Sequence, residues 1–213
     1  MRVFEQLGNN HVIPVIVVEN ADHAVPMAEA LVEGGVTALE VTLRTPVGLD
    51  VIERIARNVP EAIVGAGTVT DAAQFQQVID AGGRFAVSPG ITDSLAITAN
   101  ASGLPWLPGT VTASEILLAM QLGFEDLKFF PASVSGGPPA IKAFTSVFSN
   151  IRFCPTGGVK PENMVDYLSI PNVKAVGGSW LVTNELLENQ DWAHMTRLAK
   201  EAVARANEIL GES

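Results

Sequence analysis

One lysine stands in a part of the sequence where charged residues are rarely found. Lys128 lies within an apolar run, residues 126–131, that is typical of a short buried strand. Burial disfavours the charged form of an amine and lowers its pKa, and a neutral amine attacks ketones to form a Schiff base. We therefore interpret Lys128 as a candidate nucleophile. The alternative is a strand-end lysine that extends to solvent or pairs with a carboxylate.

Glu40 and Arg44 lie four residues apart in another apolar run, residues 38–44. Side chains alternate along a strand, so Glu40, Thr42 and Arg44 are expected on one face. The planar guanidinium of Arg44 is suited to a substrate carboxylate, and Glu40 would then transfer protons. The alternative is a buried ion pair between the two residues that only stabilises the fold.

Two glycine turns follow two late apolar runs and predict a phosphate site. Backbone N–H groups in such turns bind anions, and each turn could lead into the positive end of a helix. A single glycine pair also marks an ordinary turn, so the prediction depends on the occurrence of two. The residues involved are Gly157, Gly158, Gly178 and Ser179.

These candidate residues require a scaffold that brings the ends of several strands together. Eight apolar runs recur roughly every 20 to 26 residues, the length of a strand plus a crossover helix, which predicts an α/β fold, a single (β/α)8 TIM barrel domain over residues 1–213. A short amphipathic segment, residues 2–8, is expected as an N-terminal helix at the mouth of the barrel. The main alternative is a doubly wound open sheet, and the number of units favours the barrel. The predicted strands are 11–18, 38–44, 62–68, 85–89, 106–109, 127–130, 151–155 and 173–177.

Helix boundaries between the strands carry local signals. Asp71, Thr92 and Thr112 each precede a helical segment as an N-cap, and Thr112 is followed three residues later by a glutamate, as in a capping box. Helices are expected to stop at the glycines at 34–35, 82–83 and 123.

Composition restricts the class of protein. The 213-residue chain is 47% hydrophobic and 17% charged, as expected for a globular protein. Its formal net charge of −10 disfavours binding to nucleic acid, and no apolar run reaches the roughly 20 residues of a membrane span. One cysteine and three scattered histidines form no zinc motif, so we predict no metal. The single cysteine and the lack of a signal peptide favour a cytoplasmic protein.

Taken together, these motifs resemble one enzyme family over nearly the whole chain. The matching stretches are residues 14–17, 34–36, 39–45, 64–69, 88–90, 128–132, 153–158 and 177–182. They closely resemble the 2-keto-3-deoxy-6-phosphogluconate (KDPG) aldolase family, including members that also cleave 2-keto-4-hydroxyglutarate (KHG).

The resemblance implies a role for each candidate residue. Lys128 corresponds to the Schiff-base lysine and Glu40 to the proton-transferring glutamate. The remaining substrate contacts implied are Arg44 and Thr68 for the pyruvate carboxylate, Pro89 and Phe130 lining the pocket, Thr156 on the substrate, and Gly157, Gly158, Gly178 and Ser179 for the phosphate. Phe130 is equally compatible with a plain core aromatic. The loop 133–139 departs from the family, which commonly has an acidic residue where this chain has Ser133.

The resemblance also implies a reaction, a small-molecule substrate and an assembly. The expected activity is reversible cleavage of KDPG to pyruvate and D-glyceraldehyde 3-phosphate, and of KHG to pyruvate and glyoxylate, by a homotrimer without a cofactor. One competing hypothesis is a sugar-phosphate isomerase or epimerase, in which Glu40 is the base and Lys128 an electrostatic clamp. Another is a barrel that only binds a phosphorylated metabolite, which leaves three converging ionisable groups without a role.

Overall fold

Short apolar runs form parallel strands in the computed structural model, which describes residues 2–212. These strands are buried on both faces, which explains their near-continuous apolar sequences. The strand segments in the described residues are β1 (Val12–Ile16), β2 (Ala38–Thr42), β3 (Ile63–Gly67), β4 (Ala86–Val87), β5 (Trp106–Leu107), β6 (Gly109–Thr110), β7 (Asp126–Phe129), β8 (Arg152–Pro155) and β9 (Val176–Gly178).

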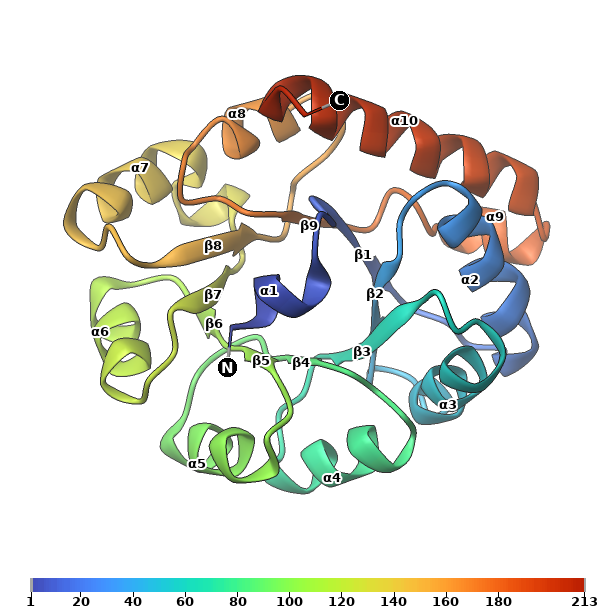
Figure 1. The fold of residues 1–213 in the computed structure, drawn as a ribbon, viewed down its shortest axis with the longest axis horizontal. Coiled ribbons are helices and arrows are strands. Elements are labelled where there is room, and N and C mark those ends of the chain that lie inside the picture. The colour runs from blue at the N-terminus through green and yellow to red at the C-terminus, as the bar shows by residue number, and fades with distance from the viewer. Residues whose placement is uncertain (1, 213) are drawn as a thin grey trace.

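The strands form a curled parallel sheet with helices on its outer side (Figure 1). One part has the order β5-β4-β3-β2-β1-β9 and the other β6-β7-β8, and every pairing between these strands is parallel. The prediction of an α/β fold with parallel strands is therefore confirmed.

Several observed strands are shorter than predicted, and the predicted strand 38–44 ends at Thr42, so that Arg44 lies in the turn that follows β2. Two further strands are irregular. The run 106–109 is divided into β5 and β6 at Pro108, which has no N–H to donate to a ladder. The run 173–177 becomes regular only at Val176, while Val173 makes an isolated bridge to Phe153. The sequence pattern located both strands but not these irregularities.

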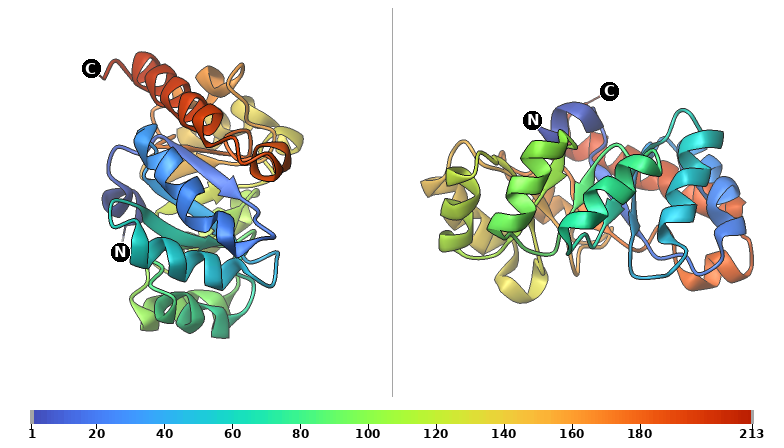
Figure 2. Two further views of the ribbon diagram at one scale, coloured as in Figure 1. Left: turned by 90° about the vertical axis from the view of Figure 1, so that its right-hand side faces the viewer. Right: turned by 90° about the horizontal axis from the view of Figure 1, so that it is seen from below.

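Helices follow the strands and lie around the outside of the sheet (Figures 1 and 2). Two 3₁₀ segments, η1 (Ala21–His23) and η2 (Ser133–Ser135), also occur. The α-helices in the described residues are α1 (Val3–Leu7), α2 (Ala24–Glu33), α3 (Gly48–Asn58), α4 (Ala72–Asp80), α5 (Asp93–Ser102), α6 (Ala113–Gln121), α7 (Gly137–Val147), α8 (Met164–Leu168), α9 (Asn184–Glu188) and α10 (Trp192–Leu210).

The predicted helix starts are confirmed by their caps. Asp71 and Thr112 form capping boxes at α4 and α6, and the Thr92 side chain accepts from Leu95 N at α5. Each cap satisfies backbone N–H groups that the first helical turn leaves without a partner.

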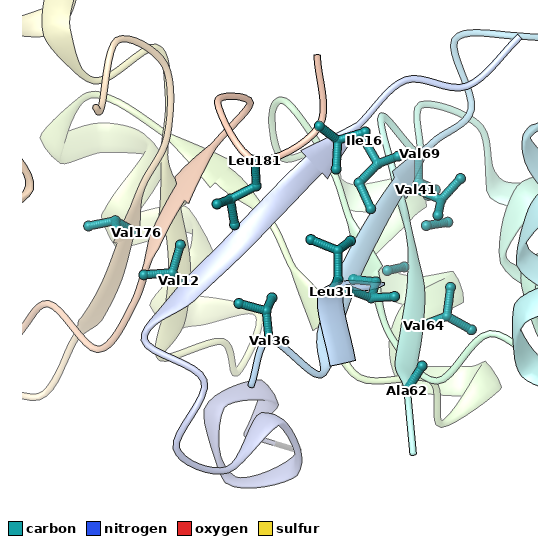
Figure 3. Close-up of a cluster of buried hydrophobic side chains, with 14 of the residues drawn as sticks. Val12, Ile16, Leu31, Val36, Val41, Ala62, Val64, Val69, Val176 and Leu181 are labelled. Atoms are coloured by element: carbon teal, nitrogen blue, oxygen red, sulfur yellow. The ribbon is translucent and has the colours of Figure 1, made fainter. Parts of the chain in front are cut away.

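The main hydrophobic core fills the space between the sheet and the surrounding helices. Figure 3 shows part of it, where Leu31 of α2 packs beside Ile16, Val41 and Val64 of neighbouring strands. These side chains are 0–1% exposed. Because helices cover this outer face, the alternate side chains of each strand point inward, toward the centre of the curled sheet.

Helix α1 covers the end of the sheet where the strands begin, as predicted (Figure 1). Its buried residues Val3, Phe4 and Leu7 belong to a second cluster made with inward-facing side chains of the strands. Phe4 N also donates to Asp126 Oδ2 at 3.0 Å, and Arg152 Nη2 donates to the same oxygen at 2.9 Å. The beginning of β7 is therefore fixed to α1 and to β8.

Two structural features are absent from residues 2–212. No helix in this part of the chain is long and apolar enough to cross a membrane. The described residues also contain no group of three or more His, Cys, Asp or Glu side chains placed to hold a metal ion.

Candidate active site

Lys128 and Glu40 meet inside the curled sheet, although 88 residues separate them in the chain. β7 carries Lys128 and β2 carries Glu40, and the distance from Lys128 Nζ to Glu40 Oε1 is 3.1 Å. The two residues are 4% and 3% exposed. The Phe130 ring lies 5.2 Å from Lys128 Nζ, on the side of the strand end. A buried amine in contact with a carboxylate can transfer its proton and become a nucleophile.

Gly67 on β3 has no side chain and leaves space for the Glu40 carboxylate. Thr42 is paired in register with Gly67, which lies beside the Glu40 carboxylate. A methyl group on Gly67 would overlap Glu40 Oε1 and lie 2.7 Å from its Cγ. Gly67 therefore has a steric reason to be glycine, because any larger residue displaces the carboxylate from Lys128.

Replacement of Gly67 with alanine is expected to lower kcat/KM about 100-fold, because a small displacement of a reacting group has effects of this size. Steady-state cleavage assays would measure it. Gly90→Ala is the matched control, since a methyl group there would meet no atom within 4 Å. Unchanged activity in Gly67→Ala would show that the position of Glu40 does not control the rate.

Arg44 does not pair with Glu40. The alternative hypothesis of a purely structural ion pair between these two residues is therefore wrong. Arg44 is exposed at the end of β2, and its Nε donates to Thr68 Oγ1 at 3.1 Å. Thr68 has φ +60, a left-handed conformation that is uncommon for a β-branched residue. The structure thus brings Arg44 and Thr68 together at the mouth, above the Lys128–Glu40 pair, with the guanidinium open to an anion.

Cys154 also belongs to the interior of the site, which the sequence did not indicate. It is paired in register with Lys128 on the neighbouring strand and is 3% exposed. Burial raises the pKa of the Cys154 thiol to about 12, so the thiol stays protonated near neutral pH and is a poor nucleophile. Lys128 is consequently the stronger candidate of the two neighbours.

The turn after β8 is held against the loop that leaves β7. Ala132 N donates to Thr156 O at 2.8 Å, and Ser133 N donates to Gly157 O at 3.0 Å. Gly157 and Gly158 have φ +97 and +79, which glycine adopts without strain. Ser133, where the sequence departs from the family pattern, lies beside Gly158. A methyl group on Gly158 would overlap the Ser133 hydroxyl.

The second predicted glycine turn is not a turn at its glycines, because Gly177 and Gly178 belong to strand β9 and the chain bends only at Ser179. Both glycine positions are nevertheless crowded. A methyl group on Gly177 would overlap Thr156 Oγ1, and one on Gly178 would overlap the Trp180 ring. Thr156 is 5% exposed, whereas Ser179 is exposed immediately after β9. The turn at Gly157 and Gly158 and the end of β9 therefore lie side by side, next to Thr156.

The expectation that each glycine turn leads into a helix N-terminus is wrong. Helix α8 begins only at Met164, after a turn at residues 160–163, and α9 begins at Asn184. Both helices have five residues, so their dipoles are small. An anion at these positions would therefore gain little from a helix dipole.

Pro89 is the remaining predicted site residue, and it lies at the end of β4. It is exposed, while the preceding Ser88 is fully buried and accepts a hydrogen bond from Trp106 Nε1 at 2.7 Å. A methyl group on Gly109 would overlap the Pro89 carbonyl, so β6 passes close to this turn. Pro89 is thus fixed at the same rim as Thr68 and Phe130.

Comparison with known proteins supports what this geometry suggests. The model of the family "KDPG and KHG aldolase" matches residues 3–198. This chain belongs to the KDPG and KHG aldolase family. The KHG/KDPG aldolase of Escherichia coli K12 is 52% identical over 200 residues, which cover 94% of each chain.

Solved structures of family members are similar over almost the whole chain. KDPG aldolase from Legionella pneumophila, with pyruvate captured as a covalent carbinolamine intermediate, has a TM-score of 0.90 and 44% identity over 92% of this chain and 95% of that one. The aldolase of Zymomonas mobilis ZM4, with 3-phosphoglycerate, has a TM-score of 0.91 and 46% identity over 96% of each chain. Covalent chemistry on pyruvate therefore occurs within this aldolase family.

Proposed function

We propose that this chain is a class I aldolase that reversibly cleaves KDPG to pyruvate and D-glyceraldehyde 3-phosphate through a Schiff base on Lys128. The observation that carries the proposal is the buried contact of 3.1 Å between Lys128 Nζ and Glu40 Oε1. It supplies a nucleophilic amine and a proton acceptor in one water-poor interior. Cleavage of KHG to pyruvate and glyoxylate is proposed as a second activity, since the E. coli relative is named for both substrates.

In the proposed mechanism, Glu40 first accepts a proton from Lys128. The free amine attacks C2 of the substrate, and Glu40 returns its proton to the C2 oxygen, which leaves as water and gives a protonated imine while Glu40 becomes a carboxylate again. Glu40 then accepts the proton of the C4 hydroxyl, the C3–C4 bond breaks, and its electrons move into the imine to give an enamine. Glyceraldehyde 3-phosphate leaves, the enamine is protonated at C3 through Glu40, and hydrolysis of the imine releases pyruvate.

Arg44 and Thr68 are proposed to bind the carboxylate of the 2-keto acid. Their mutual hydrogen bond places both groups at the mouth, beyond the amine. Pro89 and Phe130 are proposed to line this pocket, with Thr156 on the substrate between the two ends.

Borohydride reduction in the presence of pyruvate tests the proposed function. Reduction converts an imine into a stable amine, and mass spectrometry of the peptides locates it. We expect a pyruvate-derived adduct on Lys128. A correctly folded protein that stays unmodified would favour the isomerase or epimerase hypothesis, which involves no covalent adduct.

The glycine turns predict a preference for the phosphorylated substrate. A hydrogen bond to a charged group contributes about 1.5–3 kcal/mol, so two such bonds give kcat/KM for KDPG at least about 100-fold above that of its unphosphorylated analogue. Ser179→Ala should narrow this ratio roughly tenfold while leaving the unphosphorylated substrate unaffected. Steady-state kinetics on both substrates measures the ratio, and equal values would contradict a phosphate site.

We further infer that the two parts of the sheet close into one (β/α)8 barrel. Support comes from β5 and β6, which are separated only by Pro108, and from the bridges of Phe153 to Val173 and Thr156 to Gly177. A cytoplasmic homotrimer is proposed from the family resemblance. Light scattering in solution should then give three times the 22.5 kDa of one chain.

A further inference from the structure

Thr42 carries a buried hydroxyl for which the structure offers no hydrogen-bond partner. The residue is 1% exposed, and its Oγ1 is one of three buried side-chain oxygens without a partner in residues 2–212. The others belong to Thr110 and Thr145. Leaving a buried polar group unpaired costs about 1–3 kcal/mol, and valine would fill the same space without that cost.

The position of Thr42 relates this hydroxyl to the candidate chemistry. Thr42 is the last residue of β2 and follows Glu40 by two residues, so both lie on the inward face, while Arg44 lies in the turn that follows the strand. Its partner in register is Gly67, the glycine that makes space for the Glu40 carboxylate. Because the Glu40 carboxylate reaches Gly67, Thr42 lies near the level of the Lys128–Glu40 pair and just before the turn that carries Arg44.

A 2-keto acid that spans the Lys128–Glu40 and Arg44–Thr68 pairs places its C2 oxygen at the same level. Its carboxylate would lie at Arg44 and Thr68, and its C2 carbon would be bonded to Lys128 Nζ. Lys128 is itself only 4% exposed, so a ligand that reaches the amine enters the same enclosed space as Thr42. An unpaired donor in that space matches an oxygen on which negative charge develops.

We propose that Thr42 Oγ1 donates a hydrogen bond to the oxygen on C2 of the bound 2-keto acid, which makes Thr42 a further substrate-contacting residue. As the Lys128 nitrogen forms its bond to C2, the π electrons of the carbonyl move to this oxygen. A proton from the nitrogen passes through Glu40 to the oxygen and gives the carbinolamine. The proton that Glu40 accepted from Lys128 before the attack is then transferred to the oxygen, which leaves as water. This inference rests on the proposed aldolase function.

Substitution of the hydroxyl by a methyl group tests the inference. In Thr42→Val, the rate of borohydride-trapped pyruvate adduct formation should fall about 10–100-fold, while the melting temperature stays the same or rises. Thr42→Ala also lacks the hydroxyl and replaces Thr42→Val if the valine variant is insoluble. It should slow formation of the adduct to the same extent. Thr42→Ser keeps the donor and should recover the rate to within about threefold.

Thr110→Val is the matched control, because Thr110 has an equally unpaired hydroxyl but faces away from the site. Thr110 is in register with Phe129, a core residue that packs against Phe144 and Phe153. This control should keep the wild-type rate of adduct formation. A wild-type rate in both Thr42→Val and Thr42→Ala would overturn the role of Thr42. A wild-type protein that forms no adduct would instead overturn the aldolase function itself.

Discussion

Replacement of Lys128 with arginine is expected to abolish both cleavage of KDPG and trapping of pyruvate. A guanidinium forms no imine under these conditions, so kcat should fall by at least about 10⁴-fold, a scale typical of losing a catalytic nucleophile. The substitution keeps a positive charge opposite Glu40. A neutral residue would leave that buried carboxylate unpaired, which costs about 3–5 kcal/mol in stability.

The measurement combines the cleavage assay with borohydride trapping and a melting curve. Lys142→Arg on the exposed face of α7 is the matched control and should behave as wild type. Substantial residual cleavage by a folded Lys128→Arg protein would show that the chemistry does not require this amine.

Replacement of Glu40 with glutamine should reduce kcat about 10²–10⁴-fold, the usual contribution of a general acid or base. The amide oxygen can still accept a hydrogen bond from Lys128, whose Nζ lies 3.1 Å from the present carboxylate oxygen. Imine formation should therefore be slowed less than the proton transfers at C3 and C4.

Exchange of the pyruvate methyl protons for deuterium in D₂O measures the proton transfer at C3 alone, because it requires no aldehyde. It should be slowed in Glu40→Gln to about the same extent as cleavage, whereas pyruvate trapping persists. Glu29→Gln removes one exposed charge on α2 and serves as the control. Exchange at the wild-type rate would assign the proton transfer to another group.

The α/β fold with parallel strands could be predicted from the sequence because its signals are local. Each strand is a short apolar run, and caps such as Thr112 and stops such as Gly123 mark the helices between them. Lys128 can also be identified as a candidate nucleophile from a local signal, since a charged residue contrasts with its apolar neighbours. The contact between Lys128 and Glu40 could then be anticipated only as a shared interior, because alternation gives the face of a strand but no distance.

Other features depend on contacts between distant segments, which a local pattern does not contain. Cys154 faces Lys128 through the register of β7 with β8, and Asp126 joins α1 to β8 through two hydrogen bonds. The pattern predicts a turn correctly at Gly157 and Gly158 but wrongly at Gly178, which belongs to β9, and it does not show that α8 starts only at Met164. The steric requirement for glycine at position 67 likewise depends on Glu40 of the neighbouring strand, so it can be seen in the structure but not in the sequence.

Both ends of the described chain lie on the side of the molecule away from the candidate site. Helix α1 packs where the strands begin. Near the other end of the chain, Glu212 Oε2 lies 3.0 Å from Nε2 of His11, the residue just before β1. The candidate site is at the opposite ends of the same strands. A tether on either terminus would therefore leave the mouth of the site free, so the protein could be immobilised on a support, or fused to a second enzyme, with substrate still able to enter.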